Sequence, residues 1–271
     1  MSKRDEIRPF FDRLIMVTSI SQILFYANFV PSIAMLFAPS SWHNLVFIFA
    51  LIFSIGYVTT CTFAEIWLFY DAELERRKDF LCNSLGVNIT ELQTEGYYNN
   101  ESHMPSIIKM GVNCFENIFF SVNNLKITAW RERVKAFIWL LIFVFSCLMF
   151  HDKKIVLILA QFTFSGVILI KSTRQIVYKN RVQKLYEQFH AIFIETGITH
   201  PNQLIQIIQY VMDYECLKSS SKTLLSTKIF NEHNKEWSNK WDNIKKKIAI
   251  SKDVESIAMV NHDNRQSIEQ T

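Results

Sequence analysis

Four long apolar runs dominate this chain, and they come in two pairs separated by a charged segment. A short connector joins the two runs of each pair. The runs are Leu14–Phe37, Asn44–Phe69, Val134–Phe150 and Ile155–Ile170, and the connectors are Ala38–His43 and His151–Lys154. A helix needs about 20 apolar residues to cross about 30 Å of hydrocarbon. The first two runs meet this length. The last two are shorter, and they fit if the bilayer thins or if flanking lysines extend to the interface.

The fold predicted from this pattern is an all-α membrane protein with four transmembrane helices, a cytosolic helical insert and a cytosolic helical tail. With only 6 Gly and 5 Pro in 271 residues, few tight turns are expected and long helices are favoured. The predicted parts are the N-terminus (1–13), transmembrane helices 1 and 2 (14–69), the insert with a stalk helix (70–133), transmembrane helices 3 and 4 (134–170), the tail (171–250) and a disordered end (251–271).

Lysines and arginines gather on one side of the predicted helix pairs. They precede the first run, follow the second, precede the third and follow the fourth, whereas the connector Ala38–His43 contains none. Cytoplasmic loops carry an excess of Lys and Arg. We therefore expect a multi-pass protein of the cell inner membrane, with both termini and the insert in the cytosol.

Helix boundaries can be predicted at several points. Ala64–Leu85 contains no Gly or Pro, so the second run is expected to continue as one stalk helix that ends at Gly86. Pro31 lacks a backbone donor and should kink the first helix. Apolar residues at helical spacing predict a separate amphipathic helix over Ser106–Asn124.

The sequence carries no recognisable enzyme chemistry. It has no Gly-rich phosphate loop, no His-Glu-x-x-His and no Gly-x-Ser-x-Gly, and its seven His and five Cys are scattered. We therefore expect no enzymatic activity, no metal and no cofactor. A net charge of +4 without a nucleic-acid motif argues against nucleic-acid binding. The sequons at Asn88 and Asn100 are interpreted as chance matches on the cytosolic side.

The layout and the insert resemble a known family. The insert contains Ala72-Glu73-Leu74-Glu75-Arg76-Arg77-Lys78-Asp79-Phe80, followed by Glu95-Gly96-Tyr97-Tyr98-Asn99-Asn100. With two helices before it, two after it and a cytosolic tail, the chain resembles the SMODS-associated four-transmembrane effectors of bacterial cyclic-oligonucleotide antiphage signalling. The resemblance implies a membrane-disrupting effector that a nucleotide signal switches on during phage infection.

Candidate residues follow for a ligand site and for a pore in a homo-oligomer. A nucleotide needs cations for its phosphates and aromatic faces for its bases. The ligand candidates are Arg76, Arg77, Lys78, Tyr97, Tyr98, Lys109 and Arg131; the alternative is that these cations are set by membrane topology alone. Polar residues in the apolar runs are expensive against lipid, so they are expected to pack against another helix or to line a pore. These residues are Gln22, Asn28 and Gln161.

Other functions remain open at the level of sequence. The main alternative is a non-enzymatic membrane anchor or sensor that recruits a soluble partner through the tail, with Leu204–Met212, Trp237 and Trp241 as the docking surface. A channel or transporter is a further possibility. The lipid bilayer is the expected partner under every hypothesis. A cyclic nucleotide ligand or a soluble protein is the possible second partner.

The predicted topology is testable by cysteine labelling of intact cells. A probe at Ser40, in the outer connector, is expected to react with an impermeant reagent, and a probe at Asn100, in the insert, is expected not to react. Labelling of the insert from outside would reverse the predicted arrangement.

Overall fold

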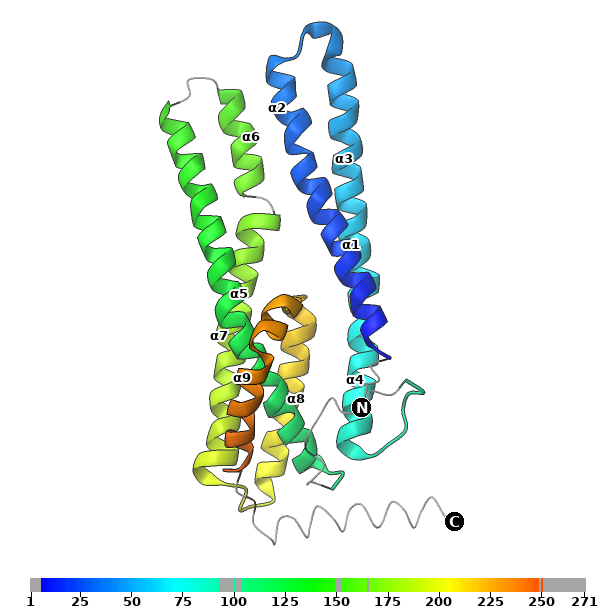
Figure 1. Cartoon of the computed structure of the whole chain (residues 1–271), viewed down its shortest axis with the longest axis vertical. Coiled ribbons are helices and arrows are strands. Elements are labelled where there is room, and N and C mark those ends of the chain that lie inside the picture. The colour runs from blue at the N-terminus through cyan, green and yellow to red at the C-terminus, as the bar shows by residue number, and fades with distance from the viewer. Residues whose placement is uncertain are drawn as a thin grey trace. The chain divides into compact units, whose positions relative to one another are not determined.

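The computed structural model describes residues 6–92, 100, 104–149, 153–164, 166–248 and 250. These residues form helices, and the one β-bridge among them joins Ile198 to Ile250. The α-helices are α1 (Arg8–Ala27), α2 (Phe29–Phe37), α3 (His43–Phe63), α4 (Phe69–Leu85), α5 (Ile107–Met149), α6 (Lys153–Thr163), α7 (Lys171–His190), α8 (Asn202–Ser221) and α9 (Thr227–Lys245). A 3-10 helix, η1 (Ser40–Trp42), and three π-helical segments, η2 (Ala64–Leu68), η3 (Gly166–Ile170) and η4 (Ala191–Thr196), complete the set (Figure 1).

The all-helical prediction is confirmed, and several predicted helix ends match the structure. The stalk helix continues from α3 through η2 into α4 and ends at Leu85. Gly86 and Gly197, which follow helical segments, both have φ of 68°, a conformation that a residue without Cβ adopts easily. The first helix is interrupted at Asn28, three residues before Pro31, because the proline cannot donate to the carbonyl of Ala27.

The number of candidate spans differs from the prediction. Three helical stretches are long and apolar enough to cross a membrane, namely Arg8–Phe37, Ser40–Leu85 and Lys154–Thr196. The predicted span Val134–Phe150 is not among them. Glu132, Arg133 and Lys135 are part of the same helix, and the apolar stretch described after them runs only from Ala136 to Met149. Three of the four predicted spans therefore qualify by length and composition among the described residues, and the third run does not.

Helix α5 also corrects a predicted boundary. The amphipathic helix expected at Ser106–Asn124 and the third apolar run are parts of one helix of 43 residues. No Gly or Pro follows Gly111 within it, so no residue of the sequence ends the helix between the two parts.

The chain divides into two compact units. Unit 1 comprises Met1–Ile7, Glu73–Thr128 and Val177–Thr271; unit 2 comprises Arg8–Ala72 and Ala129–Ile176. The predicted insert and the predicted tail thus contribute most of unit 1, and the four apolar runs lie in unit 2.

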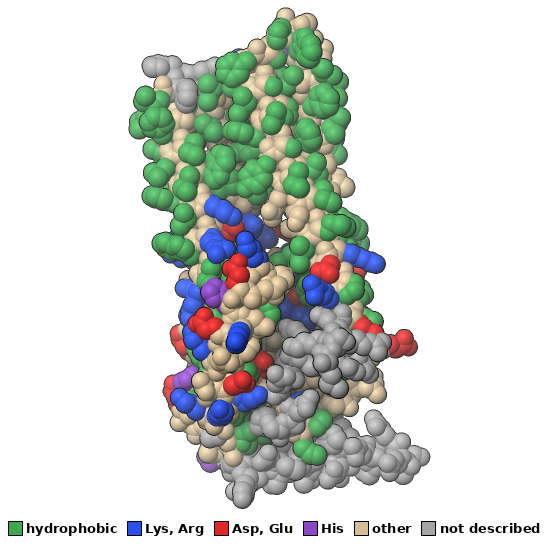
Figure 2. Space-filling view, viewed as in Figure 1, with side chains coloured by type: hydrophobic (Ala, Val, Ile, Leu, Met, Phe, Trp, Pro, Cys, Tyr) green, Lys and Arg blue, Asp and Glu red, His purple; other side chains and the backbone are tan. Residues whose placement is uncertain are grey.

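Unit 2 exposes apolar side chains on the outer faces of its helices. Val30 is 69% exposed, and Phe37 is 77% exposed. Figure 2 shows hydrophobic side chains covering these helices. Its interior is small and aromatic: the Phe162 ring lies 5.0 Å from Phe25 and 4.6 Å from Phe29. Exposed apolar side chains around a small interior are the pattern expected of helices long and apolar enough to cross a membrane.

Unit 1 buries an apolar core between its helices. The Phe115 ring of α5 stacks on Phe189 of α7 and on Phe193 of η4, each at 5.9 Å. Trp241 of α9 meets Phe115 edge-on at 5.3 Å. Offset and edge-to-face pairs of this kind add roughly 0.5–1.5 kcal/mol each beyond area burial. The core therefore joins residues of the insert to residues of the tail.

Gly111 allows α5 to approach its neighbours closely. A Cβ at this position would lie 2.6 Å from Ile207 Cγ2 of α8 and 3.0 Å from Phe193 Cζ of η4. Ile207 and Phe193 are both fully buried, so neither side chain has space to withdraw. The glycine thus sets the distance between α5 and α8.

Gly111→Ala is expected to lower the melting temperature of the purified chain in detergent, followed by circular dichroism, because overpacking a core costs roughly 1–3 kcal/mol. Gly56→Ala is the matched control. Its Cβ would meet only the flexible end of Leu24, at 3.3 Å, so no loss is expected. An unchanged melting temperature for Gly111→Ala would show that α5 can move away from α8 to accommodate the added methyl group without a loss of stability.

Candidate functional site

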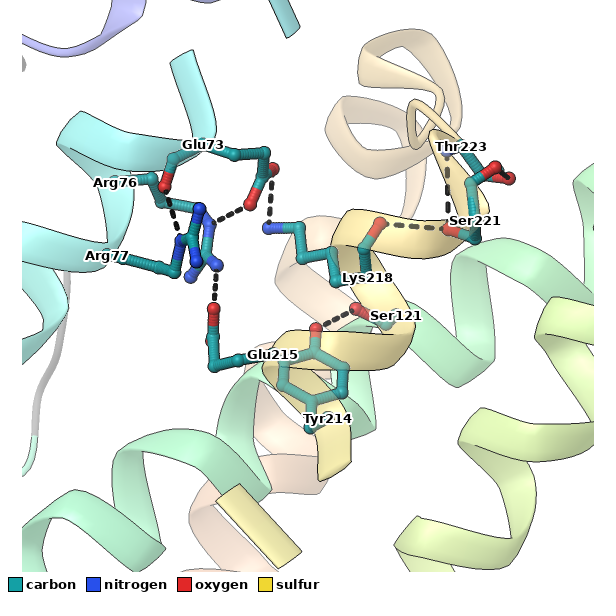
Figure 3. A network of polar contacts seen from close by, with 9 residues as sticks. All are labelled: Glu73, Arg76, Arg77, Ser121, Tyr214, Glu215, Lys218, Ser221 and Thr223. Carbon is teal, nitrogen blue, oxygen red and sulfur yellow. Dashed lines mark hydrogen bonds and ion pairs between the residues drawn. The ribbon is translucent and has the colours of Figure 1, made fainter. Parts of the chain in front are cut away.

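Two helices of unit 1, α4 and α8, are joined by four charged side chains, here called the ion network (Figure 3). Arg76 Nε donates to Glu73 Oε2 over 2.8 Å, and Arg76 Nη2 donates to Glu215 Oε2. Lys218 Nζ lies 3.2 Å from Glu73 Oε1. Two carboxylates and two cations make the ion network neutral.

Local spacing explains how each helix presents its charges. Glu73 and Arg76 are three residues apart on α4, and Glu215 and Lys218 are three residues apart on α8. Residues at this spacing are neighbours on one helix face. Each helix therefore offers one acid and one base, and the two pairs complement each other.

The ion network is largely withdrawn from water. The Glu73 side chain is 2% exposed, and those of Arg76, Glu215 and Lys218 are 15–16% exposed. Burial, and then the neighbouring Arg76 guanidinium, lower the pKa of Lys218, whereas both carboxylates act in the opposite direction. Since an unpaired charge would be costly at this depth, the four groups stabilise one another only as a set.

The groups around the ion network keep their protons. The Tyr214 hydroxyl lies 2.9 Å from Ser121 Oγ, and burial raises the pKa of Tyr214 well above its usual value. Burial likewise raises the pKa of the Cys114 thiol. A reactive cysteine needs its thiolate form. The chemistry of this site is therefore that of charge pairing between helices.

The predicted ligand residues do not form one cluster among the described residues. Arg76 belongs to the ion network, Arg77 Nε donates to the Glu73 carbonyl over 3.2 Å, and Lys78 Nζ lies 2.7 Å from Glu75 Oε1. Lys109 is half-buried on the part of α5 that belongs to unit 1.

The remaining ligand candidates lie elsewhere. Arg131 is exposed on the part of α5 that belongs to unit 2. Tyr97 and Tyr98 lie outside the described residues.

The predicted pore residues occupy three different environments in unit 2. Asn28 Nδ2 donates to Ser54 Oγ of α3 over 3.0 Å, and Asn28 Oδ1 is buried without a hydrogen-bond partner among the described residues. Gln22 is half-buried on α1, and Gln161 is exposed on α6. Asn28 thus makes the interhelical contact expected of a packed polar residue and retains one acceptor.

A second polar cluster in unit 1 holds Asn100. The Asn100 Nδ2 group donates to Asn113 Oδ1 over 2.8 Å and to Glu116 Oε2 over 2.7 Å. Asn113 in turn donates to Ser84 Oγ of α4 over 3.1 Å. Asn100 is completely buried, so a cysteine there would be shielded from a reagent on either side of a membrane. Exposed Lys126 is the informative position for the topology test.

The predicted docking surface of the tail is mostly interior. Trp237 and Trp241 are 4% and 2% exposed. On α8, the large apolar side chains that remain exposed are those of Ile205 and Met212, which are 68% and 61% exposed.

Sequence reasoning missed Glu215 and Lys218. The signal available for them was an acid–base pair at helical spacing directly after the buried residues Ile207, Val211 and Tyr214. The partner helix could not be identified from that pair.

Comparisons with protein-family models, with curated proteins and with solved structures give no match to this chain. The geometry of the described residues therefore carries the functional argument.

Arg76→Met is expected to lower the melting temperature strongly, because removing one partner of a buried ion pair costs roughly 3–5 kcal/mol. The double variant Arg76→Met/Glu215→Met should lose less than the sum of the two single variants, since it leaves fewer unpaired charges. Lys240→Met, at the exposed pair with Glu236, should leave the melting temperature unchanged. Strict additivity in the cycle would contradict coupling through the ion network.

Proposed function

We propose that this chain is a signal-responsive membrane effector. Unit 2 is a bundle of four transmembrane helices with both termini of the chain in the cytosol, and several copies of the chain together permeabilise the inner membrane. Unit 1 receives a cytosolic signal such as a cyclic nucleotide. The family resemblance of the insert and the layout of apolar runs are the sequence support for this function.

The case for a fourth span rests on one face of α5. Large apolar side chains recur on this face at helical spacing and are exposed in unit 2: Trp130, Val134, Phe137, Leu141, Phe145 and Leu148. Leu148 is 78% exposed. An apolar stripe of this kind is costly in water and suited to lipid. Arg133 and Lys135 would extend to the interface, which lets a short apolar stretch cross.

The observation that carries the proposal is the chain's path between the units. Helices α4, α5 and α7 each contain residues of both units, and Glu73 is the first residue of unit 1 on α4. An α-helix transmits displacement along its axis because its backbone hydrogen bonds are internal. A change in the ion network therefore acts on a helix that begins in unit 2.

A phosphate-bearing ligand has a direct chemical means of changing the ion network. Arginine binds phosphate in the same bidentate manner as carboxylate. A phosphate that paired with Arg76 would displace Glu73 or Glu215. Displaced Glu215 would be left buried without its ion-pair partner, and displaced Glu73 would keep only Lys218. The α4–α8 contact would then separate, which is the proposed active state.

The proposal is tested with the purified full chain in vesicles that hold a self-quenching dye. Added cyclic di- and trinucleotides are expected to release dye, and Glu215→Gln is expected to release dye without a ligand because the α4–α8 contact is weakened. Asn28→Leu should abolish release while the chain still inserts. Asn88→Leu, an exposed position in unit 1, is the matched control and should behave as the unaltered chain does.

Sealed vesicles under every nucleotide and with Glu215→Gln would refute permeabilisation. That result would favour the membrane anchor, in which the tail recruits a partner.

A further inference from the structure

Exposed aromatic and cationic side chains of unit 2 gather at one level of its helices. Arg174 of α7 pairs with Glu65 of η2 at 3.2 Å, and Lys171 of α7 lies 3.8 Å from Glu132 of α5. Lys171 and Arg174 are one turn apart on α7, about 4.5 Å along its axis. The two ion pairs therefore place Glu65 and Glu132 at nearly the same level.

Large aromatic residues lie next to both glutamates. Trp67 and Tyr70 follow Glu65 and are 54% and 57% exposed, and Trp130 precedes Glu132 and is 61% exposed. The chain leaves one apolar run through η2 and α4, and it enters another along α5. Trp67 and Tyr70, which follow Glu65, and Trp130, which precedes Glu132, therefore lie on the same side of the ion pairs. Trp and Tyr concentrate at membrane–water interfaces. We call Trp67, Tyr70, Trp130, Arg131 and Arg133 the interface belt.

Two cations of the interface belt have no carboxylate partner among the described residues. The Glu132 carboxylate lies 2.9 Å from the Lys135 ammonium and 3.8 Å from that of Lys171, and Glu65 forms an ion pair with Arg174. Arg131 and Arg133 are exposed and make no ion pair within the described part of the chain. Their charge is thus available to an external anion.

The positions of the two arginines decide which anion fits. They are two residues apart on a helix, so they point in directions roughly 200° apart around α5. A single small ligand cannot contact both guanidinium groups from one side. Phospholipid headgroups surround a membrane helix at every angle, and separate headgroups can bind each arginine.

We propose that Arg131 and Arg133 bind the phosphate headgroups of anionic phospholipids, with Trp130 beside them in the interface. The inference rests on the membrane placement of unit 2 in the proposed function. It assigns Arg131 to lipid, in place of the nucleotide ligand predicted from sequence. Each guanidinium pairs with the headgroup phosphate of one lipid through charge-assisted hydrogen bonds.

The test titrates the detergent-solubilised full chain with short-chain phosphatidylglycerol or phosphatidylcholine and counts bound lipids by native mass spectrometry. Phosphatidylglycerol is expected to bind more tightly. Arg131→Gln/Arg133→Gln should weaken binding at each of the two headgroup sites about fivefold, since each cation near an anionic surface contributes about 1 kcal/mol. Arg181→Gln/Lys184→Gln removes two exposed cations of α7 in unit 1 and should change binding little.

Three outcomes would overturn the assignment. These are equal binding of the two lipids, equal losses in the two double variants, and displacement of the lipid by inorganic phosphate at similar concentration. The last would show that any small anion suffices. Lipid binding is independent of dye release, so a chain that binds phosphatidylglycerol but never permeabilises vesicles would refute the proposed function and leave this inference standing.

Discussion

Charge neutralisation in a dry interior is the constraint on which unit 1 depends. Four ionised groups sit where isolated charges would cost several kcal/mol each, so α4 and α8 must lie in the one arrangement that pairs them all. Apolar packing alone tolerates small shifts in register between helices, whereas this pairing does not. The buried phenylalanines contribute to the apolar core of unit 1, and the ion network joins α4 to α8.

The two units obey opposite solvation rules within one chain. In unit 1, Phe115 and Trp241 are inside and most charges are outside. In unit 2, Val30 and Phe37 are outside, and the interior contains Asn28 and a few aromatic rings. The change occurs within continuous helices, so the pattern of side chains, and not any break in the backbone, distinguishes the two units.

Sequence reasoning succeeded where local chemistry decides the structure. Gly86 ends a helix because no other residue adopts its backbone conformation as cheaply, and Pro31 interrupts a helix because it lacks a donor. It failed where the answer depends on distant residues. The acid on α4 and the lysine on α8 are 145 positions apart in the sequence, and no local pattern relates Glu73 to Lys218. The continuity of α5 was missed because a polar stretch was interpreted as a boundary, although it contains no residue that ends a helix.

The burial of Asn100 has a consequence for covalent modification. Its sequon, Asn100-Glu-Ser102, is complete in the sequence. Both hydrogens of its side-chain amide are already engaged, by Asn113 and Glu116, and the group is inaccessible to a transferase. A glycan could be attached only before unit 1 folds, and it would then prevent the closure of α5 on α4 around that amide. Asn88 is exposed in the folded chain, so burial does not protect its sequon in the same way.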